Sequence, residues 1–192
     1  MIALRPTVSS VLIFNIQLLE TVRRVALSKK EVKELAAALG KVGDILREAE
    51  LVEVVELEGG RVLYIVDSEP ALIKAQVQHF GEVVLPTIYL LNKSKHAQRA
   101  SAIYPMAIVD TGAVKHILNG ADVMRPGIKQ ILGDFNKGDV AQVADEKRRI
   151  IAVGLWLYSR SEVEAMEKGK VIYNVHYLGD RLWKLFQELS KK

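Results

Sequence analysis

The chain has 192 residues, of which 49% are hydrophobic and 26% charged, and its 27 lysines and arginines outnumber its 23 aspartates and glutamates to give a net charge of +4. This length suits one ordinary domain or two small ones, and the composition excludes a disordered or fibrous chain. The absence of cysteine excludes a disulfide scaffold, a thiol nucleophile and any zinc site built on cysteine.

The first apolar run extends from Val8 to Leu19 and is interrupted by Asn15 and Gln17. It is about half as long as the ~20 residues that a membrane span needs, and no cleavage site of the signal-peptide type follows it. We therefore expect a core strand or helix of a cytoplasmic protein, with no membrane partner.

Local signals then predict a helix. Ser28 and Glu31 have the spacing of a capping box, in which each side chain binds an amide at the start of the helix. Apolar residues recur at helical spacing from Val32 to Leu39, which predicts one buried face. Gly40 is expected to end the helix in a left-handed conformation.

A β-hairpin is expected next. Residues 51–57 and 61–66 are β-type runs, and the two glycines of Glu58–Gly60 favour a tight turn between them. The segment from Pro70 to Phe80 is interpreted as a short helix, and that from Pro86 to Leu91 as another.

The segment from Asn92 to Ala102 lacks large apolar residues and carries three basic side chains and His96. It is expected to be an exposed linker and the first site of proteolysis, because it has too little apolar surface to order itself. The linker is either a solvated loop or a contact for phosphate. We place a domain boundary here, between residues 1–102 and 103–192.

The second half predicts many short strands and small helices. Residues 150–158 are nearly all apolar, which predicts a central strand covered on both faces. The other expected elements are a strand at 106–109, a helix capped by Asp110 or Thr111 and ended by Gly120, an extended stretch at 121–128, strands from 140 and at 171–177, a capping-box helix after Ser159 and a last helix at 181–191.

Motifs for catalysis are largely missing. The four histidines are far apart, and no phosphate-binding loop, dinucleotide fingerprint or nucleophile elbow occurs. His176 and Asp180 could form a dyad, although an isolated histidine at a strand end is more often structural. We expect a binding module and not an enzyme, with no catalytic residue, no metal and no cofactor.

One segment is more specific. Gly112 to Ile128 closely resembles the helix, loop and second strand of a PUA domain, with its two Gly-Ala pairs and its Pro-Gly-Ile. Phe135 to Val140 and Ala152 to Gly154 resemble the third-strand entry and the fourth strand. Asn174 to Trp183 and Leu85 to Leu91 are similar to the malignant-T-cell-amplified-sequence family of translation factors and its archaeal relatives.

The resemblance implies an α+β fold, with an N-terminal α/β pre-PUA domain followed by a C-terminal PUA-type β-barrel with short helices. It implies a non-enzymatic RNA-binding protein that acts on tRNA or the small ribosomal subunit in translation initiation or recycling, together with a partner translation factor and without DNA. No function is inferred from this resemblance for residues 1–27.

Two other functions stay open. The chain could be an accessory RNA-targeting subunit of a tRNA- or rRNA-modifying enzyme, of the transglycosylase or pseudouridine synthase type, because PUA domains commonly accompany these enzymes. It could also be a protein-interaction adaptor whose basic face is incidental.

Candidate RNA contacts each have a simpler explanation. Lys115 and Asn119 share a helix face that could offer an ammonium and an amide to RNA, but a lysine near a helix end also suits the dipole there. Gly120 and Gly127 either let RNA approach the backbone or serve only as turn residues. The expected RNA-binding residues are Lys115, Asn119, Gly120, Ala121, Asp122, Arg125, Gly127, Arg181 and Lys184. The larger side chains Met124, Trp156 and Trp183 are expected in the core.

Overall fold

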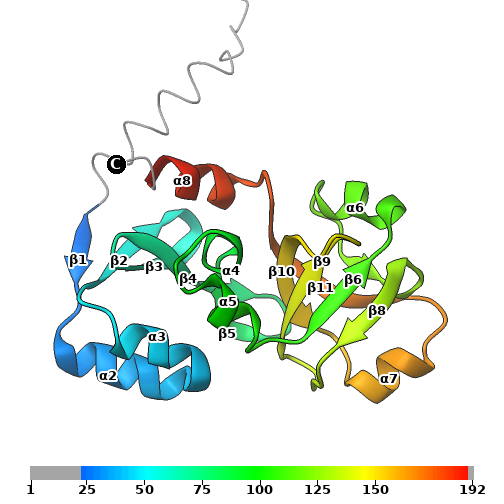
Figure 1. The fold of residues 1–192 in the computed structure, drawn as a ribbon, viewed down its shortest axis with the longest axis horizontal. Helices are drawn as coiled ribbons and strands as arrows, with labels where there is room; N and C mark the ends of the chain where they lie inside the picture. Colours follow the sequence, from blue (N-terminus) through cyan, green and yellow to red (C-terminus); the bar gives the residue numbers. More distant parts are fainter. Residues whose placement is uncertain (1–22, 190–192) are drawn as a thin grey trace, which may run out of the picture.

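The computed structural model describes residues 23–189, so the apolar run from Val8 to Leu19 lies outside the described residues. Two β-sheets lie side by side along the long axis of the molecule (Figure 1). The N-terminal sheet has five antiparallel strands in the order β1-β2-β3-β4-β5. The C-terminal sheet has six strands in the order β7-β11-β10-β9-β6-β8.

The N-terminal elements follow a simple order along the chain. They are β1 (Arg24–Ala26), α2 (Lys29–Ala38), the 3₁₀ turn η1 (Gly40–Val42), α3 (Gly43–Arg47), β2 (Val52–Leu57), the turn η2 (Glu58–Gly60), β3 (Arg61–Val66), β4 (Glu69–Val77), β5 (Gly81–Pro86), α4 (Ile88–Asn92) and α5 (Ala97–Ser101). In Figure 1 the pair α2–α3 lies below this sheet.

Several N-terminal predictions are confirmed. Ser28 caps α2 in a capping box with Glu31, and Gly40 has a left-handed φ of 56°. The hairpin β2–β3 pairs Leu57 with Arg61 across a turn in which Gly59 and Gly60 both have positive φ. The segment from residue 86 to 91 does become helical, although α4 begins only after Thr87, whose side chain accepts the Leu90 amide at 3.0 Å.

The helix expected from Pro70 to Phe80 is wrong, because this segment forms the long strand β4. Ile73, Ala75 and Val77 are buried while Gln76 is exposed, which is the two-residue alternation of a strand. The hairpin turn before it was hidden in the sequence, since Asp67 and Ser68 both have positive φ without being glycine or asparagine.

The segment 92–102 is largely exposed, as expected, but it is not an unordered linker, because it contains α5 and is packed against the N-terminal domain. Ala100 is fully buried in the N-terminal core, so a small side chain is enough to dock this short helix. The basic side chains pair with that domain: Lys95 Nζ lies 3.0 Å from Asp67, and Arg99 lies 2.6 Å from Glu48. These two cations are therefore not free for phosphate.

The C-terminal elements are β6 (Met106–Val109), α6 (Thr111–Ile117), β7 (Val123–Met124), the turn η3 (Arg125–Gly127), β8 (Ile128–Leu132), β9 (Val140–Ala144), β10 (Ile150–Trp156), α7 (Arg160–Ala165), β11 (Lys170–Tyr177) and α8 (Arg181–Leu189). The two edge strands β7 and β8 are consecutive in the chain and joined only by η3, so the sheet curls toward closure as a barrel. This confirms the α+β class and a C-terminal curled β-barrel with short helices.

Strand β10 is buried along its whole length, as its composition predicts. Ile151 and Trp156 pack inside the barrel, whereas Val153 and Leu155 belong to the N-terminal core. Helix α8 also reaches from the C-terminal half to the N-terminal half, because its Leu182 and Phe186 pack into the N-terminal core. Figure 1 shows this helix above the N-terminal sheet. The two halves therefore share apolar surface.

Candidate nucleic-acid interface

Helix α6 presents one face to solvent at the upper end of the barrel (Figure 1). Asp110 caps it by accepting the Ala113 amide at 2.8 Å. Ile117, Val114 and Leu118 face the barrel core, so the alternate positions Lys115 and Asn119 are exposed, as the helical spacing predicts.

The loop after α6 is held in place by hydrogen bonds from strand β11. The side-chain amide of Asn174 donates to the carbonyls of Ile117 at 3.1 Å and Ala121 at 3.0 Å. The backbone N–H of Asn174 donates to the Asp122 carboxylate at 2.8 Å. Consequently Asn119, Gly120 and Ala121 form an exposed but firmly anchored backbone segment.

Gly120 has a positive φ of 87°, and a Cβ at this position would lie 3.2 Å from the Tyr177 ring. Gly127 does not have a positive φ and is limited by space, because a Cβ there would lie 2.9 Å from the Cβ of Ala113. Both glycines are therefore needed for the fold, and Gly120 alone of the two is also exposed.

Asp122 and Arg125 are occupied by the protein itself. Asp122 also pairs with Lys170, at 2.6 Å. The Arg125 guanidinium donates to the carbonyls of Val163 at 2.8 Å and Ile128 at 3.4 Å, which ties η3 to α7. These contacts place Arg125 toward α7 and away from the exposed end of α6.

Arg181 and Lys184 lie on the exposed side of α8. Arg181 has one distant acidic neighbour, Glu58 of the β2–β3 turn at 4.0 Å. Tyr177, whose ring would meet a Cβ at position 120, lies only four residues before Arg181. The start of α8 and the loop after α6 thus share the upper end of the molecule in Figure 1.

His176 and Asp180 do form the predicted hydrogen bond, at 2.8 Å, but the His176 side chain is fully buried. Burial alone would raise the pKa of Asp180, yet hydrogen bonds from His176 and from the backbone amides of Trp183 and Tyr177 outweigh it and hold that pKa below its usual value. Asp180 thereby caps α8, and the pair has a structural role.

The three large side chains that were expected in the core differ in their burial. Trp156 is fully buried and stacked on Phe135, with ring centroids 3.7 Å apart, as expected. Trp183 is half-buried beneath the ammonium of Lys93, which lies 5.0 Å from its ring centroid. Met124 is 49% exposed on the edge strand β7, so its expected place in the core is wrong.

Sequence reasoning missed a basic group at the same end of the barrel. Lys147, Arg148 and Arg149 lie in the turn between β9 and β10, and all three are exposed. The signal was available, because three consecutive cations occur nowhere else in the described part of the chain.

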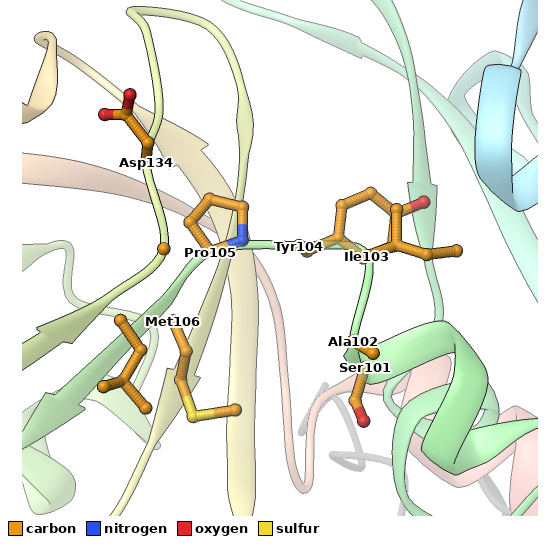
Figure 2. Close-up of a pocket in the computed structure, with 9 residues that line it drawn as sticks. Ser101, Ala102, Ile103, Tyr104, Pro105, Met106 and Asp134 are labelled. Atoms are coloured by element: carbon orange, nitrogen blue, oxygen red, sulfur yellow. The ribbon is translucent and has the colours of Figure 1, made fainter.

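A shallow pocket of about 310 Å³ lies where the chain passes from one sheet to the other. Figure 2 shows Pro105 at its centre, with Asp134 and Met106 on one side and Ile103 and Tyr104 on the other. Burial raises the pKa of the Tyr104 hydroxyl. Within residues 23–189, no group of three histidine, aspartate or glutamate side chains could hold a metal ion, and no helix is long and apolar enough to cross a membrane.

Comparisons with known proteins agree with this geometry. Residues 105–178 match the PUA domain model, and residues 23–94 match a domain of unknown function. An uncharacterized protein of Methanocaldococcus jannaschii is 35% identical over 86% of this chain and 98% of its own length. Translation machinery-associated protein 20 of Saccharomyces cerevisiae is 29% identical over 82% of this chain and 84% of its own.

Two further matches extend the comparison. Malignant T-cell-amplified sequence 1-B of Xenopus laevis is 35% identical over 51% of this chain and 53% of its own. A hypothetical protein of Pyrococcus horikoshii has a crystal structure that superposes with a TM-score of 0.69, at 29% identity over 85% of this chain and 99% of that one.

Proposed function

This chain belongs to the family of two-domain PUA proteins that includes its archaeal relatives, the translation machinery-associated 20 proteins and the malignant-T-cell-amplified-sequence proteins, and we propose that it binds structured RNA in translation. Its target would be tRNA or the small ribosomal subunit, in initiation or recycling. It would act in the cytoplasm, without catalysis of its own and beside a partner translation factor.

The observation that carries this proposal is the anchored loop after α6. Asn174 holds the carbonyls of Ile117 and Ala121, so the exposed Asn119 side chain lies on an ordered loop next to the exposed Lys115 ammonium of α6. A surface ordered before binding loses less entropy when it meets RNA. Lysine ammonium groups and asparagine side-chain amides are among the groups that hold phosphate and sugar, whereas the backbone N–H groups of Asn119, Gly120 and Ala121 already donate to the carbonyls of His116 and Ile117.

The predicted site residues fall into two roles in this proposal. Asp122, Arg125 and Gly127 shape the loop and the turn beneath it, because their polar groups or their close packing are already used. The residues proposed to contact RNA are Lys115, Asn119, Gly120, Ala121, Arg181 and Lys184.

We also propose residues 102 and 103 as the border between the two domains, supported by the two sheets and by family matches that end at 94 and begin at 105. Among the relatives reported above, the Saccharomyces cerevisiae protein has a translation-machinery name and none has the name of a modifying enzyme, so the accessory-subunit alternative gains no support.

The test is the binding of an unmodified tRNA transcript and of purified small ribosomal subunits, measured between 50 and 200 mM salt. Lys115→Glu should weaken binding and reduce the slope of log affinity against log salt by about 1. Lys137→Glu, which makes the same charge change at the other end of β9, should leave the slope unchanged. Equal behaviour of the two variants, or wild-type protein that binds neither RNA, would refute the proposal.

A further inference from the structure

The turn between β9 and β10, residues 145–149, is a rigid basic projection. Asp145 is nearly buried and accepts the backbone amides of Lys147 and Arg149, each at 2.9 Å. Its carboxylate also pairs with the Arg149 guanidinium at 2.6 Å. Burial would raise the pKa of Asp145, but these hydrogen bonds hold it below its usual value, so the anchor stays ionised.

Two cations of this turn are uncompensated. Glu146 pairs with Lys129 at 2.8 Å, and Asp145 is already paired with Arg149. Lys147 and Arg148 have no ion pair with any acidic side chain in residues 23–189, and both are exposed. The turn therefore projects two free positive charges from a fixed backbone.

Local folding does not explain an arginine at the tip. Arg148 has a φ of 60°, in the left-handed region where glycine or asparagine is more stable. Strain of this kind at an exposed residue points to a use for its side chain. None of the large exposed apolar residues, Val25, Leu51, Met124 and Tyr158, lies in the turn, and a protein interface would need such residues at its centre.

The turn lies between the two regions proposed above to contact RNA. On one side, the pairing of Ile108 with Ala144 and the ion pair of Lys129 with Glu146 bring it beside the start of α6. On the other side, the Ile151 carbonyl accepts the Leu178 amide at 2.9 Å, three residues before α8 begins. Figure 1 shows the end of β9 and the start of β10 between α6 and α8.

The same turn also meets the N-terminal domain. The side-chain amide of Asn92, at the end of α4, donates to the Ile150 carbonyl at 2.8 Å. The adjacent Lys93 lies over Trp183 of α8. The cations of the turn thus stand at the seam between the two domains, and not on the barrel alone.

We propose that Lys147 and Arg148 bind backbone phosphates of the same structured RNA that contacts α6, so that one continuous surface runs from Lys115 across the seam to Arg181. This inference rests on the proposed function. Side chains on a rigid turn suit phosphate contacts, which position a protein on folded RNA without reading its sequence.

The experiment compares two double variants of the full chain with equal changes of charge. Lys147→Glu/Arg148→Glu alters the turn, whereas Lys137→Glu/Lys168→Glu alters the opposite end of the barrel, before β9 and before β11. Binding to an unmodified tRNA transcript is measured from 50 to 200 mM salt. The slope of log affinity against log salt should fall by about 2 in the turn variant, so that its affinity deficit widens about 16-fold between 200 and 50 mM.

Arg148→Gly guards against misfolding, because glycine accepts the left-handed φ of this position. It should lower the slope by about 1 while the protein remains at least as stable as wild type. The proposal is overturned if the turn variant keeps the wild-type slope, or if the opposite-end variant shows the same loss.

The outcomes separate this proposal from the one it rests on. If Lys115→Glu weakens tRNA binding and the turn variant does not, the RNA function stands and only the extended surface falls. If the turn variant keeps its affinity for tRNA but loses binding to a poly-glutamate chain, the turn serves an acidic protein partner and the proposal is also overturned. A wild-type protein that does not bind tRNA would refute both.

Discussion

Replacing Phe186 by alanine should destabilise both sheets together. Phe186 is fully buried in the N-terminal core although it lies on the last helix, and its ring meets that of His176 edge-on at 5.5 Å between centroids. A buried phenylalanine-to-alanine change costs about 3–5 kcal/mol. At about 2–4 °C per kcal/mol for a protein of this size, the melting temperature should fall by about 6–20 °C.

The coupling follows from shared surface. Val153 and Leu155 of β10 and Leu182 of α8 belong to the N-terminal core, so loosening α8 removes contacts from both halves. Calorimetry should show one transition that moves as a whole. Hydrogen exchange should show a similar loss of protection in the hairpin β2–β3 and in β9–β10.

Tyr158→Ala is the matched control, because it removes an aromatic ring that is 38% exposed on the barrel. Its effect should stay within about 1 kcal/mol. The reasoning is refuted if Phe186→Ala splits the transition in two, or if only the N-terminal amides lose protection while the barrel exchanges as in wild type.

Three further outcomes are expected. Asp180→Asn should cost about 1–3 kcal/mol near neutral pH. Because the folded-state pKa of Asp180 is depressed, its contribution is present above pH about 4 and is lost on acidification, so the urea midpoints of variant and wild type should converge as the pH falls below about 4. Arg148→Gly should stabilise by about 1 kcal/mol in thermal melts, whereas Lys147→Gly, where φ is not positive, should give no gain. Asn174→Ala should weaken tRNA binding without altering its salt slope, because it frees the loop after α6 and removes no cation; a reduced slope would contradict its positioning role.

Features governed by neighbouring residues were determined by the sequence alone. The Ser28 capping box, the glycine turn of the β2–β3 hairpin and the Asp110 cap each depend on groups within a few residues of one another. The outward position of Lys115 follows in the same way from the helical spacing of Val114 and Ile117. Local hydrogen bonds and periodicity encode such features directly.

Features that depend on distant partners were decided only by the tertiary structure. Strand β4 is a strand because β3 and β5 flank it, and α5 is ordered because Ala100 reaches the N-terminal core and Arg99 reaches Glu48. The orientation of the Arg125 guanidinium is set by the Val163 carbonyl of α7, 38 residues further along the chain. The position of Lys147 and Arg148 beside the border between the two domains is likewise visible only in the structure, through the contacts of the neighbouring Ile150 with Asn92. Ion pairing, burial and the end of the barrel at which a turn lies are all set by contacts between residues far apart in the chain.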